Sequence, residues 1–358
     1  MNERWLVGII RILAIALWIT VIFLYLFFPN PITLWQQQKS INVYSWTEVI
    51  DMRQVVEFQK QTGIKVNIGY YESNEELFAK FKVTRGSGYD LIVPSEYMVE
   101  PLLQEGLLQK LDKSKLNFWH RLNPRLLNRY YDLNNDYAIP YLWSIYGIGV
   151  NTKCLPPDKG VPSWSLLFDQ SIPLPRVMIE TAREMLLLAI YYLYGSIDAI
   201  TDEKIKAAEQ LLMQQKKLVI SYTEVGAPYL LTSGQCPIAV AASPYVLRVV
   251  EHNPHIDFII PREGTFAVLD TLVIPASSEK QDLVYQFINF LYKPETLAFH
   301  VNRTYFLPPT TDVACKEVNV SSKKLLMACA KSLTDFEFFR NVIPIDRVND
   351  FWIALKSP

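Results

Sequence analysis

The chain has 358 residues, half of them hydrophobic, and a formal net charge of −1. This length allows two domains with sizeable cores, and the near-neutral charge argues against a nucleic-acid-binding protein, which would be strongly basic. The four cysteines include no C-x-x-C pair; they are Cys154, Cys236, Cys315 and Cys329. The sequence therefore disfavours a zinc site or a thioredoxin-like redox site. Cys315 and Cys329 could pair in an oxidising compartment, and four separate small buried residues are an equal alternative.

An apolar segment begins the sequence. Residues 12–28 carry no charge and are almost entirely apolar, and Arg4 and Arg11 precede them. A cleaved secretory signal and a retained membrane anchor are the two interpretations. No small-residue cleavage pattern and no cysteine for a lipid follow the segment, which favours the anchor. The two arginines favour a cytoplasmic N-terminus with the body outside. We therefore expect residues 1–40 to be a signal or anchor segment with a tether.

The first part of the body alternates between predicted strands and predicted helices. Strand patterns cover residues 41–45, 65–70 and 91–93, and a helical pattern follows each of them. Asp51 and Ser73 are expected to cap the first two helices. This β-α-β-α-β-α order is typical of a parallel sheet that is covered by helices.

Polar and aromatic side chains follow each of these three strands. Because the carboxyl ends of parallel strands meet at one edge of a sheet, we expect the three groups to lie together and to form a ligand site. Any one group alone is more often an ordinary solvated turn. The groups are Trp46-Thr47-Glu48, Tyr71-Glu72-Ser73 and Ser95-Glu96-Tyr97.

The second part of the body also predicts an α/β domain. A turn at 134–136 precedes residues 137–143, and residues 147–151 look like a strand that crosses out of the first domain. The further predicted helices cover 182–193, 202–215, 282–291 and 294–301, and the further predicted strands cover 218–222, 238–242 and 272–275.

Several sequence blocks between residues 41 and 310 are together specific to one protein family, although no single block is. They are Tyr44-Ser45-Trp46-Thr47-Glu48, Gln61-Thr62-Gly63-Ile64-Lys65-Val66, Tyr71-Glu72-Ser73-Asn74-Glu75, Tyr89-Asp90-Leu91-Ile92-Val93-Pro94-Ser95, Leu111-Asp112-Lys113-Ser114-Lys115-Leu116, Asn134-Asn135-Asp136-Tyr137, Ala182-Arg183-Glu184 and Ile288-Asn289-Phe290-Leu291. With these blocks the chain resembles the periplasmic polyamine-binding proteins of ABC transporters, of the PotD type.

The resemblance implies an α/β fold of the periplasmic-binding-protein type II. Two α/β lobes would be joined by crossover strands, with the ligand cleft between them. The first lobe would comprise 41–147 plus 270–310, and the second 148–269 plus 311–358. The implied function is capture of a polyamine, such as spermidine or putrescine, in the periplasm and its delivery to the permease subunits of an ABC importer. No cofactor and no metal are implied.

Family members hold the polyamine between aromatic rings and carboxylates. Ring faces attract ammonium groups, and carboxylates bind them through charge-assisted hydrogen bonds. The positions that match by motif are Trp46, Thr47, Ser95, Tyr97, Thr181, Glu184, Asp270 and Tyr305.

This chain departs from the family pattern at several of these positions. Val49 replaces a tyrosine, and Thr181 replaces an aspartate for which Glu180 could substitute. Ala242 and Val268 replace two tryptophans. The ligand could therefore differ. Alternatively, new aromatic walls could form, for which the candidates are Tyr245 and Phe266.

Purely structural roles compete with these assignments. Thr181-x-x-Glu184 is itself a capping box, Asp270 could be half of a buried ion pair, and Trp46 could be plain core. No G-x-S-x-G, Walker or H-E-x-x-H motif occurs, so an enzyme is disfavoured. A tethered sensor and a binder of another small cationic or organic solute are the alternative functions.

Overall fold

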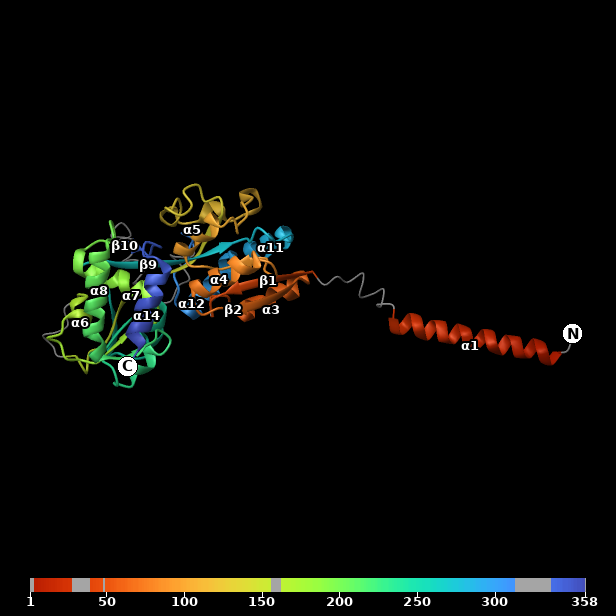
Figure 1. Cartoon of the computed structure of the whole chain (residues 1–358), viewed down its shortest axis with the longest axis horizontal. Helices are drawn as coiled ribbons and strands as arrows, with labels where there is room; N and C mark the ends of the chain where they lie inside the picture. The colour runs from red at the N-terminus through yellow and green to blue at the C-terminus, as the bar shows by residue number, and fades with distance from the viewer. Residues whose placement is uncertain (1–2, 28–38, 48, 156–161, 313–335, 358) are drawn as a thin grey trace.

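The computed structural model describes residues 3–27, 39–47, 49–155, 162–312 and 336–357. The helix α1 (Glu3–Phe27) lies apart from the body of the chain in Figure 1. Its apolar side chains are exposed, among them Leu13, Leu17 and Trp18. Within the described ranges, no helix combines the length and the apolar character that crossing a membrane requires.

The first half of the body has the predicted alternation of strands and helices. Its three parallel strands are each followed by a helix, and β1 lies between β2 and β3. The Asp51 carboxylate accepts a hydrogen bond from the backbone N–H of Arg53, and the Ser73 hydroxyl accepts one from that of Glu76, so both predicted caps are confirmed. The elements are β1 (Ser40–Ser45), α3 (Met52–Thr62), β2 (Lys65–Tyr70), α4 (Asn74–Thr84), β3 (Leu91–Ile92) and α5 (Glu96–Gln104).

Two long antiparallel strands, β4 (Ala138–Asn151) and β9 (Thr265–Val273), cross between the halves. They occupy the middle of the strand order β2-β1-β3-β9-β4-β7-β5-β6. The sequence predicted two separate elements where β4 is continuous, and only the end of β9. All fourteen residues of β4 are buried, so it lacks the polar alternation by which a half-exposed strand is recognised.

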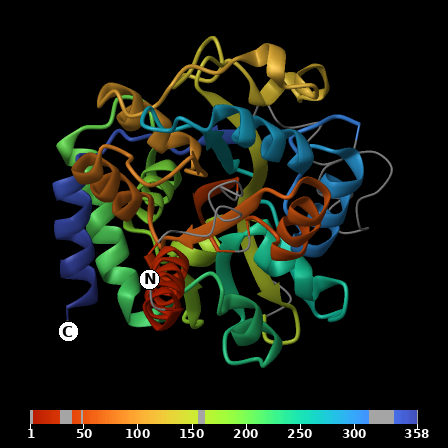
Figure 2. The ribbon, with the colours of Figure 1, turned by 90° about the vertical axis from the view of Figure 1, so that its right-hand side faces the viewer.

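The second half repeats the parallel arrangement, with β5 between β6 and β7. The C-terminal helix α14 packs against α7 and α8, as the blue and green helices show in Figures 1 and 2. The elements are α6 (Ser165–Phe168), β5 (Arg176–Met178), α7 (Ala182–Tyr194), α8 (Asp202–Gln215), β6 (Val219–Tyr222), α9 (Ala227–Thr232), β7 (Ile238–Ala242), α10 (Ser243–Val250), β8 (Ile256–Ile259), β10 (Phe336–Phe338) and α14 (Ile345–Lys356).

Two further helices, α11 (Gln281–Leu291) and α12 (Pro294–Thr304), return the chain to the first half, where α11 packs against α3 and β1. Short 3₁₀ turns cover Lys113–Lys115, Trp119–Arg121, Pro124–Leu126 and Lys216–Leu218. Cys154 and Cys236 are free, and the suggested Cys315–Cys329 pair lies outside the described residues.

Candidate ligand-binding site

Asp270 is buried on the crossover strand β9, with 6% of its surface exposed. A β-bridge joins its backbone to that of Ser95, and the Ser95 side chain acts to lower the pKa of the carboxylate. Burial, with a smaller contribution from Glu184, raises the pKa of Asp270 to about 8. Among the described groups no lysine or arginine forms an ion pair with this carboxylate, so the ion-pair interpretation finds no support here.

Asn74 fixes the start of helix α5, where the predicted site residues Ser95 and Tyr97 lie. Its amide oxygen accepts a hydrogen bond from the backbone N–H of Ser95 at 3.2 Å. Its amide nitrogen donates to the hydroxyl of Tyr97 at 2.9 Å. Asn74 is 1% exposed, and sequence reasoning did not assign it a role. Asn74 directly follows the Ser73 cap and so begins a helix at the sheet edge where ligands bind. This position could have identified it from the sequence.

Aromatic rings lie beside this group. The rings of Trp46 and Tyr71 are 4.5 Å apart between centroids, and Trp46 is half-buried with its indole N–H lacking a partner in the described structure. Burial and the charge of Asp270 both raise the pKa of Tyr71, which places that ring near the carboxylate. Thr47 is exposed and lines a surface cavity with Asp51, so no described contact joins it to Asp270. Glu48 lies outside the described residues.

Glu184, in the first turn of α7, reaches this region from the second half of the body. The hydroxyls of Tyr146 and Thr181 each lie 2.6 Å from its Oε2. The capping-box interpretation is wrong, because the Thr181 side chain makes no cap hydrogen bond and donates to the carboxylate instead. Burial is the main cause that raises the pKa of Glu184.

Glu224 is a second acid in the same place, and sequence reasoning missed it. Its Oε1 lies 2.6 Å from the hydroxyl of Tyr146, and its Oε2 accepts a hydrogen bond from the backbone N–H of Ala242 at 2.9 Å. Glu224 is 7% exposed, and burial followed by the charge of Glu184 raises its pKa to about 8. Its position just after the predicted strand 218–222 was the signal that could have found it.

Glu96 is a further buried acid, and it begins helix α5. One carboxylate oxygen accepts a hydrogen bond from the backbone N–H of Leu269 at 2.8 Å, and the other has no partner in the described structure. Complete burial raises the pKa of Glu96 well above its usual range, and the charges of Asp270 and Glu184 add to this shift.

Arg183 is a buried cation in this region, and its guanidinium is already engaged. Its Nε lies 3.3 Å from a carboxylate oxygen of Glu75, and one terminal nitrogen donates to the backbone oxygen of Ile343 at 2.6 Å. The ring of Tyr97 lies 5.9 Å from its guanidinium carbon. Arg183 therefore forms its ion pair with Glu75, and its charge only partly offsets the rise in the pKa of Glu184.

The other predicted aromatic side chains make contacts of their own. The hydroxyl of Tyr305 donates to Glu251 at 2.9 Å, and its ring packs with a different apolar cluster from that of Trp46 and Tyr97. Phe266 is fully buried and stacks on Phe339 at 4.3 Å, so it belongs to the core rather than to a ligand wall. Tyr245 is half-buried beside Arg248.

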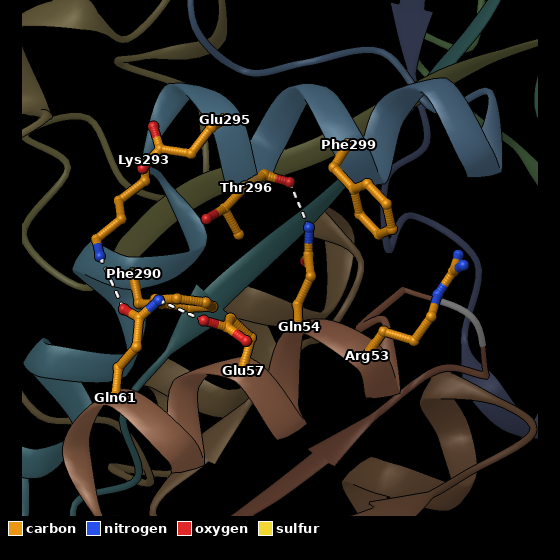
Figure 3. Close-up of a pocket in the computed structure, with 9 residues that line it drawn as sticks. All are labelled: Arg53, Gln54, Glu57, Gln61, Phe290, Lys293, Glu295, Thr296 and Phe299. Carbon is orange, nitrogen blue, oxygen red and sulfur yellow. Dashed lines mark hydrogen bonds between the residues drawn. The ribbon is translucent and has the colours of Figure 1, made fainter.

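A cavity of about 380 Å³ lies between α3 and the α11–α12 pair (Figure 3). The Gln54 amide donates to the backbone oxygen of Thr296 there, and Lys293 donates to Gln61. None of the predicted ligand residues lines this cavity. The buried acids therefore form a separate group.

The buried acids suit a cationic ligand. Four carboxylates with raised pKa values gather where the two halves meet, and none has a described cationic partner: they are Glu96, Glu184, Glu224 and Asp270. Burying ionised carboxylates is costly unless a cation pairs with them. No group of three or more metal-binding side chains occurs among the described residues. An organic cation with several N–H donors would satisfy such a site.

Comparisons with known proteins agree with this chemistry. Residues 53–328 match the family model described as bacterial extracellular solute-binding protein. A spermidine/putrescine-binding periplasmic protein of Salmonella typhimurium is 33% identical over 304 residues, which cover 84% of this chain and 86% of the relative. The putrescine-binding periplasmic protein PotF of Escherichia coli is 29% identical over 324 residues, covering 86% of this chain and 84% of PotF.

A solved structure has the same fold. The protein, from Listeria monocytogenes and described as a spermidine/putrescine ABC transporter, superposes with a TM-score of 0.81 at 27% identity. The superposition covers 89% of this chain and 99% of that one. The fold is therefore that of the type II periplasmic solute-binding proteins, with two α/β lobes and the ligand cleft between them.

Proposed function

The chain belongs to the bacterial extracellular solute-binding proteins, and we propose that it captures a polyamine of the spermidine or putrescine class. Capture takes place in the periplasm, and the permease subunits of an ABC importer receive the ligand. The protein is a binding component and catalyses no reaction. The relatives that bind spermidine and putrescine support this assignment.

The group of buried acids without cationic partners carries the proposal. A polyamine is a flexible chain with two or more separated ammonium groups, and each ammonium has three donors and no acceptor. Asp270 is on β9 and Glu184 is on α7, and the charge of Glu184 acts on the carboxylate of Asp270. They can therefore hold two charges of one ligand, while the ring of Trp46 covers the methylene groups between them.

We assign the binding residues by motif and by this geometry. Contacts within the site support Trp46, Ser95, Tyr97, Thr181, Glu184 and Asp270, and the family pattern alone supports Thr47 and Tyr305. In this proposal the first lobe comprises 41–147 plus 270–310, and the second comprises 148–269 plus 311–358.

Residues 1–40 attach the chain to the inner membrane in this proposal. The uncharged run 12–28 and the exposed apolar side chains of α1 support the attachment. Fractionation of cells and mass spectrometry of the mature N-terminus test it. A mature chain that begins beyond residue 28 and is released with the periplasmic fraction would contradict the attachment and leave polyamine capture untouched.

Calorimetric titration of the full-length chain tests polyamine capture. Putrescine, spermidine and spermine are titrated separately, and 1,4-butanediol, which has the carbon chain of putrescine without its charges, is the control. At least one polyamine is expected to bind with one-to-one stoichiometry, and the diol is expected to give no heat. The proposal fails if none of the three amines gives heat or a thermal shift at millimolar concentration.

A further inference from the structure

The hydroxyl of Tyr146 lies 2.6 Å from Glu184 Oε2 and 2.6 Å from Glu224 Oε1. Tyr146 is on the crossover strand β4, Glu184 is in the first turn of α7, and Glu224 follows β6. All three side chains are buried. Three elements that are distant in sequence thus place one phenol between two carboxylates.

This arrangement has one hydrogen too few if both acids are ionised. A phenol donates a single proton, so Tyr146 can serve only one of the two carboxylates. The phenol oxygen and the oxygen of the second carboxylate, also 2.6 Å apart, would then have no hydrogen between them. A proton on Glu184 or Glu224, donated to the phenol oxygen, completes both hydrogen bonds. The geometry therefore requires the acids to share one added proton when no cation is present.

The surrounding charges do not remove the need for a shared proton on Glu184 and Glu224. Arg183 is near Glu184, and it is engaged by Glu75 from α4. Glu180, which precedes α7, raises the pKa of Glu224 further. Burial disfavours ionisation of both acids. Acids outnumber the described cations around Tyr146, so an incoming cation would be strongly favoured.

A second hydrogen bond holds Glu224 in place. Its other carboxylate oxygen accepts from the backbone N–H of Ala242 at 2.9 Å. Ala242 is the strand partner of Tyr146 in the pairing of β7 with β4. The backbone of the sheet therefore keeps the Glu224 carboxylate beside the Tyr146 hydroxyl.

We propose that Glu184 and Glu224, joined by the Tyr146 hydroxyl, form one ammonium-binding subsite on the second lobe, with Glu224 as its second ligand residue. This inference rests on the proposed polyamine binding. When the ammonium group enters, it donates to both carboxylates, and the shared proton leaves to solvent. Tyr146 keeps its hydrogen bond to one of the acids.

Calorimetric titration with spermidine at pH 7 tests the subsite, using the full-length chain in phosphate and in Tris. These buffers differ in protonation enthalpy, so the difference in heat counts the protons that are released. The wild-type chain is expected to release about one proton more per bound spermidine than Glu224→Gln. Loss of the charge-assisted contact should also weaken binding by about tenfold to a hundredfold.

Two further variants keep the result interpretable. Gln at position 224 can still accept from Ala242 and donate to Tyr146, so the fold is expected to persist, as a melting curve will check. Glu184→Gln is the second variant, because neutralising either acid should remove the same shared proton. The double variant should therefore release no fewer protons than either single one. Glu203→Gln, an exposed acid on α8, is the matched control and should behave like wild type.

The outcomes separate the two proposals. A wild-type chain that binds no polyamine overturns the proposed function, and the subsite with it. A wild-type chain that binds spermidine, with Glu184→Gln and Glu224→Gln matching it in affinity and in proton release, overturns the subsite alone. If Glu224→Gln does not fold, the proton count of Glu184→Gln decides.

Discussion

Arg183 Nε lies 3.3 Å from Glu75 Oε1, and this ion pair joins helix α7 of the second half to helix α4 of the first. The Arg183 side chain is 3% exposed and that of Glu75 is 26% exposed, so water screens the pair only partly. Removing one partner of a buried pair leaves the other charge uncompensated. The pair therefore joins the two halves of the body beside the candidate site.

Glu75→Gln is expected to accelerate polyamine release several-fold, because the variant loses the ion pair that holds α4 to α7. Stopped-flow displacement of bound spermidine measures the rate. Glu105→Gln is the matched control, since it breaks the exposed pair of Glu105 with Lys82, which lies within the first half. Equal release rates in the two variants would show that the Arg183–Glu75 pair does not slow polyamine release.

Asp270→Asn is expected to weaken polyamine binding more than Trp46→Leu does. The carboxylate of Asp270 is buried and has no described cationic partner, so its attraction to an ammonium is little screened. Loss of a charge-assisted bond costs about 1.5–3 kcal/mol, whereas loss of the ring should cost about 1 kcal/mol. Calorimetric titration of the three proteins measures the difference.

The melting behaviour of these variants is the control for that comparison. Asparagine has the shape of aspartate, so Asp270→Asn should melt like wild type at neutral pH or slightly higher. If Asp270→Asn binds spermidine like wild type while Trp46→Leu abolishes binding, stacking rather than charge supplies the affinity.

The ligand-free chain is expected to lose stability as the pH rises. Burial raises the pKa of Asp270 and that of Glu224 to about 8, so each holds a proton in the folded chain that the unfolded chain has released. This contribution is complete below the unfolded pKa of about 4 and is lost as the pH rises through about 8. Melting curves at pH 5, 7 and 9 should show a falling melting temperature, and spermidine should restore more of it at pH 9 than at pH 5.

Glu96→Gln is expected to protect the chain against that alkaline loss. Glu96 is fully buried, and its pKa is raised well above the usual range, so a permanently neutral side chain avoids the cost of ionisation. Glutamine keeps an acceptor for the backbone N–H of Leu269. The variant should melt like wild type at pH 5 and higher than wild type at pH 9. A melting difference that does not depend on pH would contradict this account.

Much of the fold follows from local sequence signals. Caps and turns in the sequence predicted the helices that follow β1 and β2. Asp51 and Ser73 accept hydrogen bonds from backbone N–H groups there, as expected. The crossover strands were harder to predict, because β4 is buried along its whole length and β9 continues well beyond the short run 272–275 that was recognised. Pairing between strands more than 100 residues apart defines these elements, and no local pattern encodes such pairing.

The candidate site also contains some residues that local patterns predict and others that only tertiary contacts bring in. Ser95 and Tyr97 follow a predicted strand, so the sheet topology brings them to the expected edge. Glu224 and Tyr146 join the site only through tertiary contacts with Glu184, and neither stands in a recognisable motif. The Thr181-x-x-Glu184 pattern was ambiguous in sequence, because capping and carboxylate binding use the same residue types.

The pairing of β4 with β9 also limits when the chain can fold during its synthesis. β3 pairs with β9, which lies more than 170 residues further along the chain, and β9 in turn pairs with β4. A chain that emerges with its N-terminus first cannot complete its central sheet until Val273 has appeared. Contacts between such distant segments form slowly. The topology therefore delays completion of the central sheet until most of the polypeptide has been synthesised.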